Sequence, residues 1–434
     1  MLWISIILTL AIVLMLLSLP IGFAFAVAAL GMMVLFNLDH TFPMPTIFAQ
    51  VNSFILMAVP FFIFAGGLMG AGGISKRIVA FADSIVGHFR GGLGIVTIVS
   101  SALFGTISGS SAATVSSIGL VLMPQMEKYG YPKSYTTALV ACSGVLGQLI
   151  PPSIPMILFG MLTGASVAGC FLSTASSGIL LVLVYIVINY IKCRKIDTIK
   201  LAEKQEIFTT LKKVAVSTKE ASVALLMPVL VLGGIYGGFF TPTEAGCVAV
   251  VYALVAGAAY YRETTVKKFF AAAGETASIE GSVLFILFFI FIVCKIFVYQ
   301  RVPEMIADAM LSISSNRIVI LLLINLFLFI LGALVDDVSG IMLAGPLLYP
   351  LFLKLGIHPF HMAVIIAVNQ GSGQLTPPVA SNLWIAARVS GLDVSQFVGK
   401  AMSFLLFGNL PVLLVVTFVP EFSLWLPRLV MGKI

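Results

Sequence analysis

Small hydroxyl residues and glycine are concentrated at one point inside an otherwise apolar stretch of the sequence. The cluster consists of Ser108, Gly109, Ser110, Ser111 and Thr114. Such residues let a chain turn inside a membrane protein, and they expose hydroxyl and carbonyl oxygens that can replace the hydration shell of Na⁺. A Ser/Gly motif for helix packing is the alternative. The density of hydroxyls favours an ion site at a hairpin tip.

Two adjacent acids, Asp336 and Asp337, lie in a second apolar stretch and are followed by Ser339. Carboxylates are costly inside a membrane and suggest a functional site by default. The pair could bind a cation or carry a proton. Alternatively, one acid caps a helix beginning at Ser339 and only the other faces the site, which is the interpretation we favour. An intramembrane aspartyl enzyme is a remote alternative, because such an enzyme needs two acids facing each other from separate helices.

Two Pro-Pro pairs, Pro151-Pro152 and Pro377-Pro378, follow similar segments, GQLIPPS and GQLTPP. Proline removes backbone donors and frees carbonyls upstream, so each pair predicts a broken helix. A simple proline kink is the alternative, but the occurrence of nearly the same segment twice in the chain favours a functional break. Helices that begin after the breaks aim their positive ends at the cavity, which favours an anionic substrate. The polar candidates at the breaks are Ser143, Gly144, Gln148, Asn369, Gly371, Ser372, Gly373 and Gln374.

These clusters are related by an internal repeat with a constant offset of 226 residues. Residues 124–152 aligned with 350–378 give nine identities in 29 positions, against about two by chance. The two acids fall at the positions of Ser110 and Ser111 in the first half. The chain therefore has two halves of similar plan, residues 1–191 and 222–434, joined by the basic segment 192–221.

The composition places these residues in a membrane. The chain has 434 residues, of which 60% are apolar and 9% charged, whereas soluble domains carry about 25% charged residues. Apolar runs of about 20 residues recur along the chain, as expected for a polytopic protein. The net charge of +7 reflects the basic segment 192–221, which should be cytoplasmic. We therefore expect a lipid bilayer around the protein and no nucleic-acid partner.

Counting crossings gives the predicted architecture. The first half has apolar spans at 2–17, 21–37 and 49–71, then a run at 92–127, a broken helix at 134–164 and a span at 171–190. The run 92–127 could be two crossings or a re-entrant hairpin, and we favour the hairpin. With it, the two crossings that follow return the basic segment to the side of Arg90, as the positive-inside rule requires. Each half then has five crossings, so the second half is inverted, with its hairpin at 318–352 and its broken helix at 360–388. We predict an all-α polytopic fold of two inverted repeats, a plan typical of secondary transporters.

Four motifs together resemble the large membrane subunit of tripartite ATP-independent periplasmic (TRAP) transporters. They are SGSSAATV at 108–115, GQLIPPS at 147–153, GGFFTPTEAG at 237–246 and GQLTPP at 373–378. The resemblance implies a Na⁺-coupled importer of organic acids in the bacterial inner membrane, with an elevator-type fold and no cofactor besides Na⁺. It also implies a small four-helix membrane subunit and a soluble periplasmic binding protein. Because the chain begins at its first span, we expect the small subunit to be a separate chain.

The resemblance also implies two Na⁺ sites. The first would use Ser108, Gly109, Ser110, Ser111, Ser143 and Gly144, and the second Asp336, Asp337, Ser339, Asn369, Gly371, Ser372 and Gly373. Ser166 matches a family position near the substrate, and the full set of substrate candidates is Ser108, Ser110, Thr114, Gln148, Ser166 and Gln374. Many members have Asp where this chain has Thr114.

The expected substrate is sialic acid, with a C4-dicarboxylate as the next candidate. The alternatives are a stand-alone Na⁺/carboxylate symporter of related fold and a passive channel. A channel is disfavoured because no span carries a polar face along its whole length.

Overall fold

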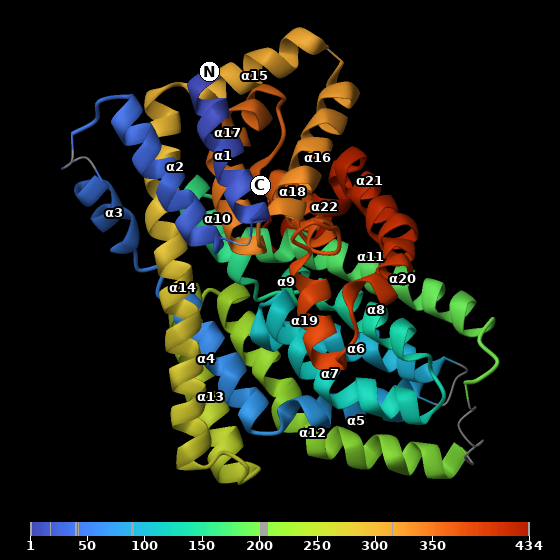
Figure 1. Ribbon diagram of the computed structural model, residues 1–434. Helices are drawn as coiled ribbons and strands as arrows, with labels where there is room; N and C mark the ends of the chain where they lie inside the picture. The colour runs from blue at the N-terminus through green and yellow to red at the C-terminus, as the bar shows by residue number, and fades with distance from the viewer. Residues whose placement is uncertain are drawn as a thin grey trace.

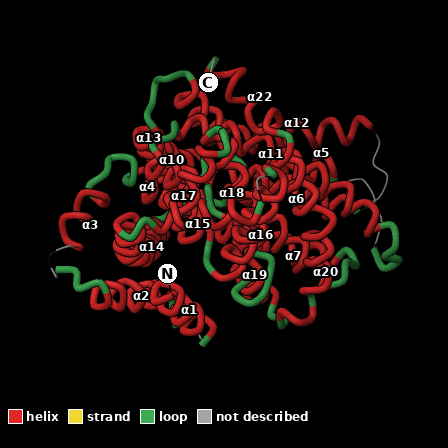
Figure 2. The backbone as a smooth tube through the Cα atoms, turned by 90° about the horizontal axis from the view of Figure 1, so that it is seen from above, coloured by secondary structure: helices red, strands yellow, loops and turns green. Residues whose placement is uncertain are grey.

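Helices are the regular secondary structure of the described chain. The computed structural model describes residues 2–17, 19–39, 41, 43–87, 91–199, 207–314 and 316–432. Within these ranges the regular elements are all helices, and Figure 2 shows only helices and loops. Such a composition fits a bilayer, because a helix satisfies its backbone hydrogen bonds within its own segment.

The first half contains eleven described helices. They are α1 (Leu2–Leu16), α2 (Ile21–Leu35), α3 (Pro43–Val51), α4 (Ala58–Ala71), α5 (Ile74–Val86), α6 (Gly92–Ser108), α7 (Ser111–Lys128), α8 (Lys133–Gly144), α9 (Leu146–Leu149), α10 (Ile154–Thr163) and α11 (Val167–Cys193).

The second half follows a similar order. Its helices are α12 (Ile207–Tyr236), α13 (Pro242–Leu254), α14 (Val266–Tyr299), α15 (Val302–Ile313), α16 (Arg317–Leu334), α17 (Asp337–Lys354), α18 (Pro359–Gly373), α19 (Ser381–Ser390), α20 (Val398–Phe404), α21 (Leu410–Phe418) and α22 (Pro420–Met431). Short π-helical turns at Val255–Tyr260 and Leu405–Asn409 extend α13 and join α20 to α21.

Helix boundaries recur at the offset seen in the sequence. Helix α7 and helix α17 correspond residue for residue at a spacing of 226, and α8 and α18 both begin at the same relative position. The peptide bonds Pro151-Pro152 and Pro377-Pro378 are both cis. The two halves therefore share their local structure, because the same glycine and proline signals stand at the same positions.

Six helices of the described chain are long and apolar enough to cross a membrane, or up to eight if each bent pair forms one span. The bent pairs are α4 with α5, at 72°, and α8–α9 with α10, at 40°. Ten crossings were expected from the sequence. The difference arises in part because expected spans near the start of the chain, α1 and α2, form helices shorter than 18 residues.

The expected span 49–71 is interrupted in the structure. Helix α3 ends at Val51 and α4 begins at Ala58, whereas the repeat-equivalent stretch lies inside α14, a continuous helix of 34 residues. Pro60 stands in the first turn of α4, where its missing N–H costs nothing. No proline interrupts residues 266–299, so α14 continues. Figure 1 shows α14 running along one side of the molecule, where it contacts α2 and α4.

The basic segment 192–221 contains the end of one helix and the start of the next. Helix α11 continues to Cys193 and α12 starts at Ile207, while residues 200–206 lie outside the described part of the chain. In α12, Lys213 Nζ lies 2.8 Å from Asp83 Oδ2 of α5. A salt bridge therefore links the start of the second half to the first half.

In each half, the helix that follows the break packs against the other half. Helix α10, from the first half, contacts α17, and α19, from the second half, contacts α7 and α8. In Figure 1, α19 lies beside α7 and α8. This exchange brings the hairpin of each half next to the broken helix of the other.

Candidate functional site

The first hairpin tip is built from the predicted hydroxyl cluster. Helix α6 ends at Ser108, and Gly109 follows in the left-handed region with φ of 61°. Ser110 is extended, and its Oγ caps α7 by accepting from Ala113 N at 3.4 Å. Ser108 Oγ and Thr114 Oγ1 are 3.3 Å apart, and both side chains are buried. The tip thus presents hydroxyls inside the protein rather than to solvent.

This tip is attached to the first break. Ile154 N, at the start of α10, donates to Gly109 O at 3.2 Å. Deeper in the hairpin, a Cβ on Gly105 would lie 2.8 Å from Gly147 Cα. Backbone therefore packs directly on backbone, which only glycine allows at this distance.

The second tip places its two acids in different environments. Asp336 occupies the N-cap position of α17, which begins at Asp337, two residues earlier than predicted. The Asp336 carboxylate accepts a short hydrogen bond from the hydroxyl of Ser339, in its own first turn. Asp337 instead points to the first half, where Ser111 Oγ donates to its Oδ2 at 3.2 Å. The two acids therefore differ in their contacts, although Asp336 makes no side-chain capping hydrogen bond to the backbone of α17.

Gln148 joins the first break to the second hairpin. One of its amide atoms lies 2.9 Å from Asp337 Oδ2 and the other 3.0 Å from Gly371 N. Donors pair with acceptors when Nε2 faces the carboxylate and Oε1 accepts from Gly371. Gln148 and Gln374 also meet, with their side-chain amides 3.1 Å apart. All four interruptions of the chain therefore converge on one cluster.

Two contacts in this cluster join residues that are equivalent in the repeat. Ser111 and Asp337 are 226 positions apart, as are Gln148 and Gln374. Repeat-equivalent residues that touch lie where the two halves meet. The cluster therefore lies at the contact between the halves.

The second broken helix contributes further polar groups. Asn369 donates from Nδ2 to Asn325 Oδ1 and to Ile365 O, each at 2.8 Å. Ser372 donates to Val368 O at 2.7 Å, so its oxygen lone pairs remain available. Gly373 packs on the backbone of Gly332 in α16, as Gly147 packs on Gly105 in the first half.

The structure also reveals buried polar side chains that the sequence did not single out. Within the described chain, the hydroxyls of Ser143 and Ser153 and both amide atoms of Gln370 and Asn382 have no hydrogen-bond partner. All four residues are fully buried. Only Ser143 was predicted. Position 370 is glycine in the first half and position 382 corresponds to Met156, so the repeat carries no signal for either amide.

Ser166 has no hydrogen bond to this cluster within the described chain. It is exposed, and its Oγ caps α11 by accepting from Gly169 N at 3.4 Å. None of the hydrogen bonds of the described residues connects it to a hairpin tip.

The donors in the cluster fit a hard, weakly bound cation. They are hydroxyl, carbonyl, carboxamide and carboxylate oxygens, which suit Na⁺. Among the described residues, His, Cys, Asp and Glu form no group of three or more that could hold a metal ion. Within the described chain, the hydroxyl of Ser143, one of the residues expected at the first ion, has no hydrogen-bond partner.

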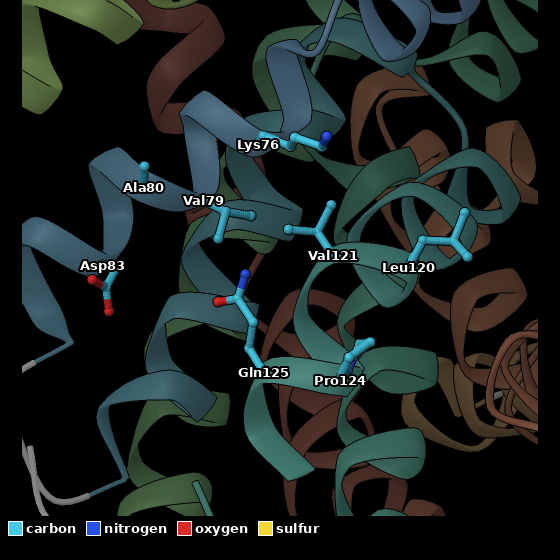
Figure 3. Close-up of a pocket in the computed structure, with 8 residues that line it drawn as sticks. All are labelled: Lys76, Val79, Ala80, Asp83, Leu120, Val121, Pro124 and Gln125. Carbon is cyan, nitrogen blue, oxygen red and sulfur yellow. The ribbon is translucent and has the colours of Figure 1, made fainter. Parts of the chain in front are cut away.

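A pocket of about 560 Å³ lies elsewhere, between α5 and the middle turns of α7 (Figure 3). Its lining consists of Lys76, Val79, Ala80, Asp83, Leu120, Val121, Pro124 and Gln125. The pocket lies more than two helical turns from the tip residue Ser111, so it is separate from the polar cluster.

Comparison with known proteins identifies the family of this chain. The family described as "Tripartite ATP-independent periplasmic transporter, DctM component" matches residues 8–422. The chain belongs to this family. The DctM family consists of transporter components and not of enzymes, and its members are multi-pass proteins of the bacterial inner membrane.

Three relatives illustrate the range of substrates named within the family. The sialic acid permease SiaM of Vibrio cholerae is 35% identical over 95% of each chain, and the C4-dicarboxylate permease DctM of the same organism is 37% identical over 88% of each chain. The isethionate permease DctMQ of Oleidesulfovibrio alaskensis is 37% identical over 87% of this chain. The matched region spans 59% of that protein's length.

The fold has a solved counterpart. The crystal structure of the Alcanivorax borkumensis YdaH transporter superposes with a TM-score of 0.63, covering 89% of this chain and 90% of that chain. The two sequences are 17% identical, so the likeness concerns the fold alone.

Proposed function

We propose that this DctM-family chain is the large permease subunit of a Na⁺-coupled importer of an organic acid. The observation that carries the proposal is the convergence of two hairpin tips and two helix breaks on one buried cluster of hydroxyl, amide and carboxylate groups. Polar groups of this kind inside a membrane protein mark substrate and ion paths.

Two Na⁺ ions would couple the transport. The first would bind among Ser108, Gly109, Ser110, Ser111, Ser143 and Gly144, and the second among Asp336, Asp337, Ser339, Asn369, Gly371, Ser372 and Gly373. The Ser111–Asp337 hydrogen bond supports coupling between them, because one residue of each set takes part in it. Occupation of one site would then alter the other.

The substrate would lie between the two ion sites and be held by hydroxyls and amides. The candidates are Ser108, Ser110, Thr114, Gln148, Ser166 and Gln374. Positive ends of helices that begin at the breaks, such as α10, favour an anion there. Sialic acid is our first choice and a C4-dicarboxylate the second, and the isethionate relative adds a sulfonate to the test.

The permease would work with a small four-helix membrane subunit and a periplasmic binding protein that delivers the acid. The family description, a component of a tripartite periplasmic transporter, supports this assembly. Inverted halves and an elevator motion complete the proposal. Direct packing of each hairpin on its broken helix through glycine, as at Gly105 with Gly147, supports movement of these elements as one block.

The test is uptake by liposomes that contain the permease and its small subunit, with the binding protein supplied outside. We expect labelled sialic acid to accumulate only under an inward Na⁺ gradient and only with the binding protein present. Parallel assays with a C4-dicarboxylate and isethionate identify the acid.

Each alternative gives a different result in the same assay. Uptake without the binding protein and small subunit would indicate a stand-alone symporter. Uptake that persists with K⁺ in place of Na⁺ would contradict the proposed coupling ion.

A further inference from the structure

We propose that Asn382, on α19 of the second half, supplies a carboxamide ligand to the first Na⁺ site, and that Gln370 supplies one to the second site. The inference rests on the proposed Na⁺ coupling and adds to each site one residue that the repeat does not reveal. It means that the first site is completed by a residue of the other half.

Asn382 is a buried amide without a protein partner. Its side chain is fully buried, and among the described residues neither Oδ1 nor Nδ2 has a hydrogen-bond partner. Burying an amide without a partner is unfavourable, so a native structure provides one from the protein, water or an ion.

The amide of Asn382 faces the predicted ligands of the first site. A Cβ placed on Gly144 would lie 3.4 Å from Asn382 Nδ2 and 3.3 Å from Ser111 O. The neighbouring Ser143 hydroxyl is buried and also unpartnered within the described chain. Because neither amide atom has a partner within the described chain, the Oδ1 and Nδ2 positions can be exchanged, and Oδ1 can face this point.

In the second half, Gln370 is also a buried amide near the hairpin. It is fully buried, and both of its amide atoms lack partners among the described residues. A Cβ on Gly340 would lie 2.2 Å from Gln370 Oε1, and one on Gly332 would lie 3.1 Å from it. The amide therefore lies between the two limbs of the second hairpin, one turn below Asp336, whose carbonyl accepts from Gly340 N.

The repeat explains why the first site needs an amide from elsewhere. The residue equivalent to Gln370 is Gly144, which has no side chain. A Cβ on Gly144 would point at Val115 Cγ2, 2.1 Å away, and the amide of Asn382 lies beside this space, with its Nδ2 at 3.4 Å. The first half therefore has no amide of its own at this position, and the nearest amide comes from the second half.

Packing of the broken helices makes this replacement possible. Helix α19 crosses to contact α7 and α8, which carry Ser111 and Ser143. In Figure 1, α19 lies beside both helices. The carboxamide oxygen that arrives with it is a hard ligand of the kind that alkali and alkaline-earth ions accept.

The test measures Na⁺ binding without transport. The full-length permease with its small subunit is purified, and its thermal unfolding is followed in a Na⁺ titration at constant ionic strength, with K⁺ as the replacement ion. Na⁺ that binds the folded state raises the melting temperature. We expect Asn382→Ala and Gln370→Ala each to increase the Na⁺ concentration for half-maximal stabilisation by about tenfold or more.

Asn189→Ala is the matched control. Asn189 is also fully buried, but its amide is satisfied by Tyr135 and Gly91 O, far from the cluster. This variant should lower the melting temperature without Na⁺ and leave the Na⁺ midpoint unchanged. Asn382→Ser, which keeps an oxygen in a smaller side chain, should have an intermediate midpoint and provides the same test if Asn382→Ala does not fold.

The outcomes separate this inference from the proposed function. A wild-type midpoint in both Asn382 variants would overturn it and indicate that the amide binds water. Absence of Na⁺ stabilisation in the wild-type protein would overturn the Na⁺ coupling itself, and the inference with it.

Discussion

At the scale of single residues, Asp337 has the most consequential position. Its carboxylate accepts from Ser111 of the first hairpin at 3.2 Å and lies 2.9 Å from the amide of Gln148. Asp336, its neighbour, is engaged with Ser339 of its own helix. The sequence predicted that only one acid faces the site, and its contacts with the first half make Asp337 our candidate for that acid.

Asp337→Asn should abolish Na⁺-dependent uptake, to below about one-tenth of the wild-type rate, without unfolding the protein. The substitution keeps the shape but removes the charge and one acceptor, and hydrogen bonds to charged groups contribute about 1.5–3 kcal/mol. Uptake in liposomes and thermal unfolding measure the two effects. Asp308→Asn is the control, because Asp308 is exposed and ion-paired with Lys354 on the surface. A wild-type rate in Asp337→Asn would remove Asp337 from the site.

Ser110→Ala should also abolish uptake while costing about 1 kcal/mol of stability, because Ser110 both caps α7 and belongs to the tip. Thr265→Ala separates these effects. Thr265 caps α14 in the same way, accepting from Lys268 N at 3.3 Å, but it is exposed and away from the cluster. Equal uptake in the two variants would mean that the Ser110 hydroxyl only caps its helix.

At the scale of elements, glycines set how closely each hairpin approaches its broken helix. Gly105 meets Gly147 in the first half, and Gly332 meets Gly373 in the second. Gly147 and Gly373 are identical residues at equivalent positions of the repeat, and both belong to motifs found in the sequence. Their backbone contacts were not predictable, because they depend on how helices distant in the sequence pack.

Gly373→Ala should destabilise the protein by about 1–3 kcal/mol, the usual range for overpacking. Its Cβ would lie 2.2 Å from the Gly332 carbonyl carbon, and backbone cannot move aside as a side chain can. Gly399→Ala is the control, because nothing lies within 4 Å of a Cβ there. Thermal unfolding compares the two variants. Equal melting temperatures would show that α16 and α18 separate at little cost.

The predicted element boundaries succeed where local signals are strong and fail where they are weak. Helix α6 ends at Ser108 and α7 begins at Ser111, at the predicted tip. The interruption between α3 and α4 was missed. Residues 52–57 are mostly apolar, so hydropathy alone predicts a continuous span there. Proline at position 60 is compatible with either a helix start or a kink.

At the scale of the whole molecule, the exchange of α10 and α19 between the halves is the dominant feature. It carries Asn382 to the first half, and repeat-equivalent residues touch each other where the halves meet. A two-fold relation between the halves produces these contacts whether the halves are parallel or inverted. The orientation of the halves therefore needs its own experiment.

The inverted arrangement predicts opposite accessibility for Lys128 and Lys354. These residues are repeat equivalents, exposed at the base of α7 and α17. In a variant without exposed Cys247, Lys128→Cys should react with a membrane-impermeant thiol reagent only from the cytoplasmic side, and Lys354→Cys only from the periplasmic side. Labelling of intact cells and of inverted vesicles measures this. Both cysteines reacting from one side would show that the halves are parallel.

The sequence by itself determined the membrane location, the helical content, the repeat and the places where helices break. These properties follow from local composition, because apolar runs, glycine and proline act on the chain within a few residues. Only the tertiary structure decided that Asp337 faces Ser111, that Gln148 meets Gln374, and that the amides of Gln370 and Asn382 are buried without partners in the described chain. Those facts depend on which limb crosses to which half, and long-range packing, not local pattern, settles that choice.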